Sequence, residues 1–380
     1  MEPLLASDTK SELLSWHSAR RGKVCDIWDD LVARDPGARI FSYREWFHAA
    51  AAAGVLTRWS VLIIHAGGRP IALFPLRKLS PWSWQVMSYM GQGNLQAVID
   101  PACEEIAWQG VAGSLRETLR AQMLSLETND EQQAERCMAA GVAYGLHATL
   151  TPVNPPIVVS RLEPNWEAFE RKMGASTAKH LRRAVRLLKE GYPDYRMEYV
   201  TSPAVCGELL PELIRWYRLH WGKRLFGCQF DDPRTVDFYR RVVAWAAERG
   251  YLVMSVMRVR EQPVVLHIMF HLPGQETLYQ HLISRDMDAL PNRYSPGLVE
   301  SVETARWAIE HGIACLDQGI GDLPYKLMLA GEKLPRWKVT LATSPARLHT
   351  LSRLEHILRH LSRLPIYATS ALRRVVSREQ

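Results

Sequence analysis

The chain has 380 residues, of which 47% are hydrophobic and 23% charged, and its net charge is +7. This composition excludes a disordered or fibrous chain, and the length, at roughly 150 residues per domain, excludes a single small module. The N-terminus lacks the basic segment and apolar core of a signal peptide, and no run approaches the roughly 18 apolar residues of a membrane span. We therefore expect a folded cytoplasmic protein.

The positive charge is concentrated at the C-terminus. From Pro345 onward there are seven arginines and two acidic residues, which together account for five of the seven net charges. Leucines recur at steps of three or four residues from Leu348 to Leu361, which predicts a basic amphipathic helix within a tail at 346–380. Such a helix either docks on its own protein, or contacts an acidic partner or the inner face of a membrane. Because the rest of the chain is nearly neutral, we do not expect a nucleic-acid partner.

The first half of the chain predicts helices and one hairpin, at 43–53 (helix), 59–78 (hairpin), 106–126 (helix running into a short strand) and 130–140 (helix). The hairpin is indicated by two β-rich runs around Gly67-Gly68. Pro155-Pro156 then interrupts the pattern before an extended segment at 157–159. We place the boundary there, between an N-terminal domain at 1–160 and a C-terminal domain at 161–345.

The second half repeats part of this order, with predicted helices at 166–189, 209–225, 235–248 and 295–311, a hairpin at 251–270, and strands at 277–283 and 314–317. Both hairpins follow a helix that carries aromatic residues, which is a weak internal repeat. The order indicates a mixed α/β (α+β) protein with a sheet built from hairpins. A doubly wound parallel sheet does not fit this order.

Ser295-Pro296-Gly297 is the strongest local signal for a ligand. Serine favours the N-cap of a helix, proline favours its first position, and glycine permits close approach to backbone N–H groups that have no partner within the helix. A phosphate group would bind there, with Arg293 adding a charge-assisted contact. The alternative interpretation is an ordinary capped helix.

Three further segments contain groups that could take part in chemistry. Asp317-Gln-Gly319-Ile-Gly321 follows a strand and precedes Tyr325-Lys326, so that a proton donor and a cation lie near a glycine turn. His281 alternates with apolar neighbours on its strand, so it faces either a cleft or the core. The basic run at 179–189, which contains Arg183, is either a solvated helix face or a site for an acidic group. The six cysteines show no CxxC pair, and we predict no metal site.

In their order along the chain, these segments resemble the CelD/BcsL-like branch of the GNAT acyltransferase superfamily, which is associated with bacterial cellulose and exopolysaccharide synthesis. The resemblance covers about residues 160–340, and Phe41-Ser-Tyr43-x-x-Trp46 with the first hairpin extends it less specifically to 1–160. The segments that carry it are His180-Leu-Arg182-Arg183 with Gly191, His220-Trp221-Gly-Lys223-Arg224, Tyr279 with Asp286, Tyr294-Ser295-Pro296-Gly297, Asp317-x-Gly319-x-Gly321 and Tyr325-Lys326.

The resemblance implies two GNAT-like halves in tandem, similar to the Fem peptidyltransferases. It implies direct transfer of an acyl group, such as acetyl, from acyl-CoA to an amine or hydroxyl of a small molecule or saccharide, without a metal. The residues expected to act are His281 or Asp317 as base or orienter, Tyr325 as acid, Arg293, Tyr294, Ser295 and Gly297 at the donor, and Arg183, Lys326 and Trp221 at the substrate. Two alternatives stay open: a Fem-like transferase that uses aminoacyl-tRNA, and a non-catalytic scaffold for exopolysaccharide synthesis.

Overall fold

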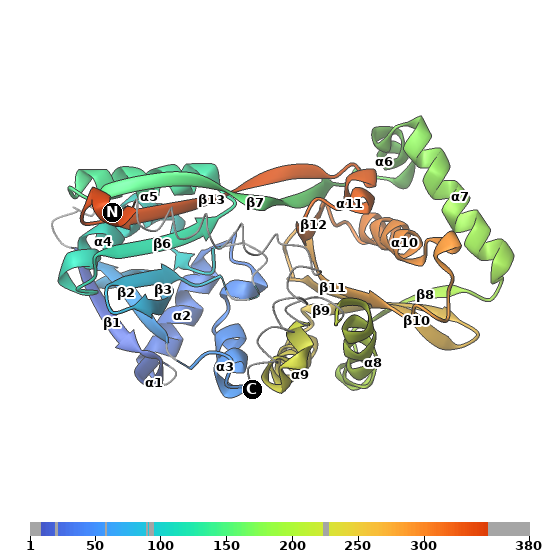
Figure 1. The fold of residues 1–380 in the computed structure, drawn as a ribbon, viewed down its shortest axis with the longest axis horizontal. Coiled ribbons are helices and arrows are strands. Elements are labelled where there is room, and N and C mark those ends of the chain that lie inside the picture. The colour runs from blue at the N-terminus through green and yellow to red at the C-terminus, as the bar shows by residue number, and fades with distance from the viewer. Residues whose placement is uncertain are drawn as a thin grey trace, which may run out of the picture.

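The computed structural model describes residues 9–348, except 20–21, 58, 89, 91–94 and 223–227. Within these residues the chain is a mixed α/β protein whose sheet runs through two lobes that lie side by side (Figure 1). The basic helix predicted in the tail lies almost wholly outside the described residues. No helix in the described part of the chain is long and apolar enough to cross a membrane.

Among the described residues a single sheet contains thirteen strands, in the order β1-β2-β3-β4-β6-β13-β7-β12-β11-β10-β9-β8, with β5 attached to β3. Most neighbouring strands are antiparallel, whereas β4 with β6 and β11 with β12 are parallel. The strands are β1 (Thr9–Ser15), β2 (Trp59–Ala66), β3 (Arg69–Ser80), β4 (Ser83–Val86), β5 (Val98–Ile99), β6 (Met123–Thr128), β7 (His147–Arg161), β8 (Arg196–Val200), β9 (Leu252–Val259), β10 (Gln262–His271), β11 (Thr277–Arg285), β12 (Cys315–Ile320) and β13 (Glu332–Ala342).

Helices cover both lobes. We call β1–β6 with α1–α5 the first lobe and β8–β12 with α6–α11 the second lobe. The α-helices are α1 (Trp16–Ala19), α2 (Lys23–Arg34), α3 (Arg44–Ala52), α4 (Glu104–Glu117), α5 (Glu131–Ala143), α6 (Trp166–Met173), α7 (Ala175–Gly191), α8 (Pro203–Trp221), α9 (Pro233–Glu248), α10 (Pro296–Glu310) and α11 (Pro324–Met328). The short 3-10 helices are η2 (Ile40–Ser42), η3 (Pro101–Cys103), η4 (Gln229–Asp231) and η5 (Asn292–Tyr294).

The long strands β7 and β13 belong to both lobes and join them along one edge (Figure 1). In the second lobe, the end of β7 pairs with β12. In the first lobe, residues 337–342 of β13 lie between β6 and the beginning of β7. The first lobe therefore obtains one of its inner strands from the part of the chain that follows the second lobe.

Glycines let the helices of the first lobe approach this sheet closely. A Cβ at Gly141 in α5 would lie 2.5 Å from the Leu341 side chain of β13, and one at Gly110 in α4 would lie 2.5 Å from Ile64 of β2. Neither distance leaves room for a methyl group. The helices consequently pack with their backbones against the side chains of the sheet.

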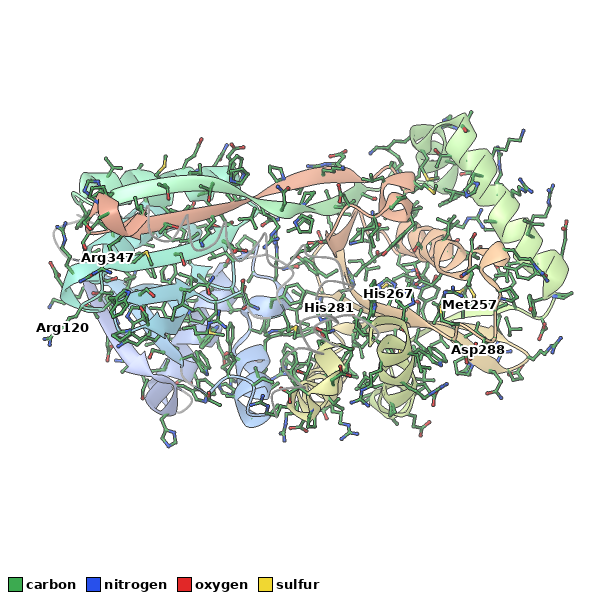
Figure 2. All side chains as sticks on the ribbon, viewed as in Figure 1. Arg120, Met257, His267, His281, Asp288 and Arg347 are labelled. Atoms are coloured by element: carbon green, nitrogen blue, oxygen red, sulfur yellow. The ribbon has the colours of Figure 1, made fainter. Side chains whose placement is uncertain are left out.

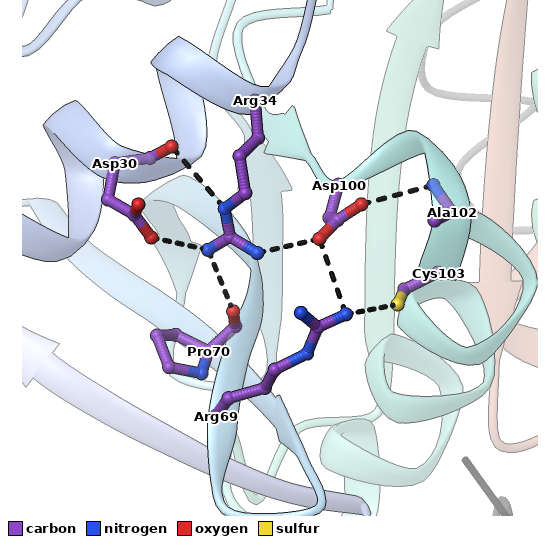
Figure 3. Close-up of polar contacts among 7 residues, drawn as sticks. All are labelled: Asp30, Arg34, Arg69, Pro70, Asp100, Ala102 and Cys103. Atoms are coloured by element: carbon purple, nitrogen blue, oxygen red, sulfur yellow. Dashed lines mark hydrogen bonds and ion pairs between the residues drawn. The ribbon is translucent and has the colours of Figure 1, made fainter. Parts of the chain in front are cut away.

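A polar network centred on Arg34 and Asp100 joins α2 to the strands of the first lobe (Figure 3). Arg34 at the end of α2 forms ion pairs with Asp30 and Asp100, each at 2.6 Å, and donates to the Pro70 carbonyl at 3.2 Å. Arg69 lies 3.6 Å from the same Asp100 carboxylate, whose other oxygen accepts the Ala102 N–H. A nearly buried carboxylate with two arginines thus fixes α2 against β3 and η3.

The two lobes also share a hydrophobic core. The central cluster of buried side chains combines α2, α3 and β2 with α8, α9 and β9–β11. In it, the Trp46 ring lies 5.3 Å from that of Phe238 and 5.9 Å from that of Phe270. Each lobe also has its own cluster on the opposite face of the sheet. The lobes are therefore joined by packing as well as by strands.

The predicted mixed α/β fold and both hairpins are confirmed, as β2–β3 and β9–β10. The prediction of one helix at 166–189 was wrong. The chain breaks at Gly174, where φ is +83°, and forms α6 and α7 instead. The extended segment at 157–159 is the end of the much longer β7, and β13 was not predicted. The domain boundary near residue 160 stays a prediction.

The shared sheet predicts that a change in β13 will destabilise the whole protein. Leu341 is fully buried, so Leu341→Ala should lower the free energy of unfolding by about 2–5 kcal/mol. The matched control is Leu219→Ala, because Leu219 is 59% exposed, and it should stay within about 0.5 kcal/mol. In urea unfolding followed by circular dichroism, the single transition should move as a unit. Two separate transitions, of which one moves, would contradict the shared core.

Candidate functional site

The centre of the second lobe is a gap between two parallel strands. β11 and β12 pair over three positions, and their register ends where Tyr279 lies opposite Asp317. β11 continues beside β10, whereas β12 continues beside β7. The pairing between β10 and β11 also contains a bulge, in which His281 is the extra residue. A bulge redirects side chains, and here it lies at the gap.

A polar cavity of about 460 Å³ occupies this gap. Residues of β10, β11, β12, α10 and α11 line it, and Ser88 and Met90 of the first lobe and Arg336 of β13 complete it. Its other lining residues are Tyr217, Gln229, Tyr239, His267, Gln280, His281, Leu282, Ile283, Ser301, Gln318, Gly319, Ile320, Tyr325 and Lys326. The cavity therefore depends on both lobes, and hydroxyl, amide and imidazole groups are frequent in its walls.

A second, mainly apolar cavity of about 360 Å³ adjoins the first. Two residues, Ile283 and Tyr325, line both cavities. The walls of this apolar cavity come from the end of α8, from β10 and β11, from the first turn of α10, and from α11 with the residue before it. The remaining lining residues are His220, Trp221, Val265, Ser284, Arg285, Gly297, Leu298 and Leu323.

Tyr325 stands at the boundary between the cavities. Burial raises the pKa of its phenol to about 12, and the negative charge of Glu300 acts in the same direction. The phenol therefore keeps its proton at neutral pH. It can donate a hydrogen bond or a proton to a group that bridges the two cavities, and its role as an acid stays a prediction.

Lys326 is buried in the wall of the polar cavity, where its ammonium binds the end of β12. Its Nζ donates to the carbonyl of Gln318 at 2.6 Å and to that of Ile320 at 2.9 Å. Burial lowers the pKa of Lys326 to about 8 despite the opposing charge of Asp317. The lysine thus holds the backbone of the glycine turn, and its contacts are with the protein.

His281 lies among aromatic rings at the junction of the lobes. Its ring centre is 5.7 Å from those of Phe41 and Trp46 of the first lobe and 5.4 Å from that of Phe270. The Nε2 atom lies 3.1 Å from the Tyr239 hydroxyl. Burial, with a contribution from the charge of His267, lowers the pKa of His281 to about 3. The imidazole is consequently neutral, which favours an orienting role over that of a base.

Asp317 lines neither cavity. Its carboxylate accepts the Gly319 N–H at 2.8 Å and so fixes the turn after β12. Burial raises the pKa of Asp317, while the charge of Arg39, the Gly319 N–H and the charge of Lys326 oppose that rise. Its role as a base or orienter in the reaction stays a prediction, and its observed contacts are with the backbone.

The predicted donor segment forms the beginning of α10. Ser295 is the N-cap residue, but it has φ +48° and its side chain makes no capping bond, because an N-cap usually needs an extended backbone. Gly297 lines the apolar cavity, and a Cβ there would meet nothing within 4 Å. Tyr294 and Arg293 face elsewhere: a Cβ at Gly191 would lie 2.7 Å from the Tyr294 ring, and Arg293 stacks on that ring at 4.9 Å.

The predicted substrate residues are separated by the structure. Trp221 lines the apolar cavity beside His220, with their rings 4.5 Å apart. Arg183 lies on the exposed face of α7, and it lines neither cavity. The apolar face of α7 is buried, which is the pattern of a solvated basic helix. Lys223 and Arg224 lie outside the described residues.

Two residues of the polar site were not found by sequence reasoning. His267 of β10 lines the polar cavity, and its Nδ1 lies 3.0 Å from the Glu300 carboxylate of α10 (His267 is labelled in Figure 2). Glu300 is completely buried. They are 33 residues apart in the sequence, so no local spacing connects them. Glu300 does not stand out in its helix either, since Ser301, Glu303 and Thr304 follow it.

Among the described residues, no group of three or more histidine, cysteine, aspartate and glutamate side chains is arranged to hold a metal ion.

The two cavities offer a hydrogen-bonding compartment and an apolar compartment, with Tyr325 between them. Such a pair of compartments can hold two substrates end to end.

Comparison with known families agrees with this geometry. Residues 175–327 match the family described as "Acetyltransferase (GNAT) domain". This segment extends from α7 to α11 and includes the gap between β11 and β12, so the chain contains a GNAT acetyltransferase domain. No curated protein matches the sequence.

Solved structures with a similar fold cover most of the chain. FemX is similar at a TM-score of 0.59 and 9% identity, over 84% of this chain and 96% of that chain. L-PGS from Bacillus licheniformis is similar at 0.53 and 11%, over 88% and 95%. The C-terminal domain of a putative lysylphosphatidylglycerol synthetase from Agrobacterium fabrum gives 0.53 and 13%, also over 88% and 95%. At these identities the likeness concerns the fold alone, and it confirms the predicted tandem GNAT-like fold.

The neutral state of His281 predicts sensitivity to acid. Its pKa falls from 6.5 to about 3 on folding, so between these values the unfolded chain binds a proton that the folded protein does not. Stability should therefore fall as pH falls below 6.5, by up to about 2 kcal/mol at pH 5. His281→Gln cannot titrate and should remove this part of the loss, whereas the exposed His311→Gln should not. Urea unfolding at pH 7 and pH 5 gives the comparison. Equal losses in wild type and His281→Gln would refute the neutral assignment.

Proposed function

We propose that this protein transfers an acyl group from acyl-CoA to an amine or hydroxyl acceptor. One observation carries the proposal: an apolar cavity begins at the first turn of α10 and meets a polar cavity at Tyr325, within a GNAT acetyltransferase domain. An acyl-CoA has a phosphate-rich end, a long arm and a reactive thioester. The apolar cavity suits the arm, and the polar cavity suits the acceptor.

In this arrangement the residues of the chain act at three places. The N–H of Gly297 in the first turn of α10 receives the pyrophosphate, since Pro296 has no N–H and those of Leu298 and Val299 donate to the Ser295 carbonyl. Trp221 and Leu298 line the path of the arm toward Tyr325. The Tyr325 phenol then gives its proton to the thiolate that leaves the thioester. The acceptor attacks the carbonyl carbon directly, so the C–S bond breaks as the new bond forms, and no acyl group is attached to the protein.

The identity of the acceptor is a narrower part of the proposal. Amide, hydroxyl and imidazole side chains such as Gln280, Gln318 and Tyr239 line the polar cavity. These groups form hydrogen bonds with polyhydroxylated or amino-bearing molecules. They favour a small saccharide or an amine as acceptor, which agrees with the association of the resembling family with polysaccharide synthesis.

A second candidate is a transferase that takes its acyl group from aminoacyl-tRNA, as Fem-like proteins do. The basic face of α7 favours it, since Lys179, Arg182 and Arg183 are exposed there and could contact phosphates. In this case binding of aminoacyl-tRNA should weaken steeply with salt, and acyl-CoA should not bind. The third possibility is a scaffold without catalysis, and it predicts that neither acyl-CoA nor aminoacyl-tRNA binds.

Binding of acetyl-CoA, measured by titration calorimetry, tests the proposal. We expect micromolar affinity for the wild type. Gly297→Trp should abolish binding, because the space beside Gly297 is open and the indole would project into it without displacing other side chains. The matched control is Gly207→Trp, since Gly207 is also a helical glycine with nothing within 4 Å of a Cβ, but it is exposed and lines neither cavity.

The control should bind like the wild type and show the same far-ultraviolet circular dichroism. Absence of binding by the wild type, with acetyl-CoA and with longer acyl-CoAs, would overturn the acyl-CoA proposal in favour of one of the other two candidates. If Gly297→Trp bound acetyl-CoA as tightly as the wild type, the apolar cavity could not be part of the donor site.

A further inference from the structure

His267 and Glu300 form a buried pair behind the polar cavity. Three donors converge on one oxygen of the Glu300 carboxylate: the Ser255 hydroxyl at 2.6 Å, the Thr304 hydroxyl at 2.8 Å and His267 Nδ1 at 3.0 Å. Ser301 lies 3.5 Å from the other oxygen. The carboxylate is thus held by groups from β9, β10 and α10, and its position relative to His267 is fixed.

The charge on Glu300 determines which ring nitrogen of His267 carries the proton. Burial alone would raise the pKa of Glu300, but the charge of His267 and the hydrogen bonds from His267, Ser255 and Thr304 lower it overall. The carboxylate is therefore ionised, and an ionised carboxylate can only accept. Nδ1 of His267 must then carry a hydrogen in either state of the ring, and in the neutral ring the lone pair is on Nε2. Because the ring lines the cavity, this lone pair is the one available to a ligand there.

This arrangement is not explained by stability. Burying a carboxylate and an imidazole together contributes little compared with apolar residues of the same size, since both groups lose their hydration. Here a glutamate that is completely buried lies in a helix whose other buried positions are mainly small or apolar. An acidic residue that orients a histidine, which in turn faces a cavity, is the arrangement used to activate nucleophiles.

We propose that His267 is the proton acceptor of the acyl transfer and that Glu300 is its positioning residue. This inference rests on the proposed function. The acceptor amine or hydroxyl gives its proton to Nε2 of His267 as it attacks the thioester carbonyl. The new C–N or C–O bond forms, the C–S bond breaks, and Tyr325 protonates the thiolate. The proton on His267 then passes to solvent, and Tyr325 regains one from solvent, so that the protein returns to its initial state.

Other titratable groups face this pair, and each fits the role less well. His281 of β11 is neutral with a pKa of about 3 and has its Nε2 beside Tyr239, so it is a weak base. The Lys326 ammonium of α11 is held by backbone carbonyls. Tyr325 of α11 and Tyr199 of β8 are phenols whose pKa burial raises. Of the groups that line the polar cavity, His267 is the base whose orientation a carboxylate fixes.

The test combines acetyl-CoA binding with thiol release. The probe is acetyl-CoA with glucosamine, which offers both an amine and hydroxyls, and free thiol reports transfer to glucosamine or to water alike. His267→Gln should lower the rate of thiol release by about 10²- to 10⁴-fold, while its affinity for acetyl-CoA stays within about threefold of the wild type. The control is His311→Gln, because His311 is exposed near the end of α10 and should behave as the wild type.

A pH profile distinguishes a base from a structural histidine. The wild-type rate should fall on the acidic side as His267 becomes protonated, and His267→Gln should lose this limb. Glu300→Gln removes the negative charge that favours the imidazolium, so its acidic limb should move to lower pH. If Glu300→Gln does not fold, His267→Gln alone decides, because it leaves the carboxylate with its hydroxyl donors.

The outcomes separate the two proposals. Failure of the wild type to bind acetyl-CoA would overturn the proposed function, and with it the role of His267. Binding without thiol release by the wild type, or thiol release by His267→Gln within about fivefold of the wild type, would overturn the assignment of His267 while leaving the donor site in place. If His267→Gln lost rate but kept the acidic limb of the wild-type pH profile, this result would equally exclude His267 as the proton acceptor.

Discussion

The separation of β11 from β12 is the constraint on which the rest of the structure depends. After Tyr279 and Asp317 the two strands have different neighbours, β10 and β7, so they diverge instead of continuing as a ladder. A gap in the middle of a sheet would normally leave backbone N–H and C=O groups without hydrogen-bond partners. Here Lys326 binds the carbonyls at the end of β12, and the Asp317 carboxylate binds the N–H of the turn. Asp317, expected as base or orienter, and Lys326, expected at the substrate, thus both bind the backbone beside the gap.

The gap is closed on its other sides by parts that come from distant regions of the chain. The first lobe contributes Ser88 and Met90 to the cavity wall and supports His281 with Phe41 and Trp46. β13 contributes Arg336, which is also bonded to the Pro155 carbonyl of β7. A GNAT domain that ended at residue 327 would lack these walls. The first lobe and β13 therefore supply walls of the polar cavity that the second lobe by itself would lack.

Much of the fold could be predicted from the sequence because its signals are local. The Gly67-Gly68 turn, the aromatic-bearing helices and the start of α10 each show in a few neighbouring residues. β7 and β13 could not be found in this way, since β7 contains Pro152, Pro155 and Pro156, and β13 contains Pro335 among charged residues. Their pairing is non-local: β13 pairs with β6 some 200 residues earlier, as at Thr340 and Ser125.

The site was predicted in part for the same reason. Tyr325, Gly297 and Trp221 line the cavities, and each belonged to a short recognisable segment. Arg183 was chosen for its charge, but the buried face of α7 turns it to solvent. His267 and Glu300 were missed because one of two histidines in β10 and one of three glutamates in α10 have no meaning until β10 and α10 pack together. Chemistry that depends on packing has no local signature.

The position of β13 has a consequence for how the protein is made. The ribosome completes the first lobe's helices and most of its strands early, but the strand that lies between β6 and β7 is the last described strand to be synthesised. Until then two strand edges of the first lobe remain unpaired, and such edges invite association with other chains. Folding domain by domain during translation, which is common for chains of this size, is not open to this lobe. A nascent chain must keep those edges apart for most of its synthesis, and this is where we expect it to need a chaperone.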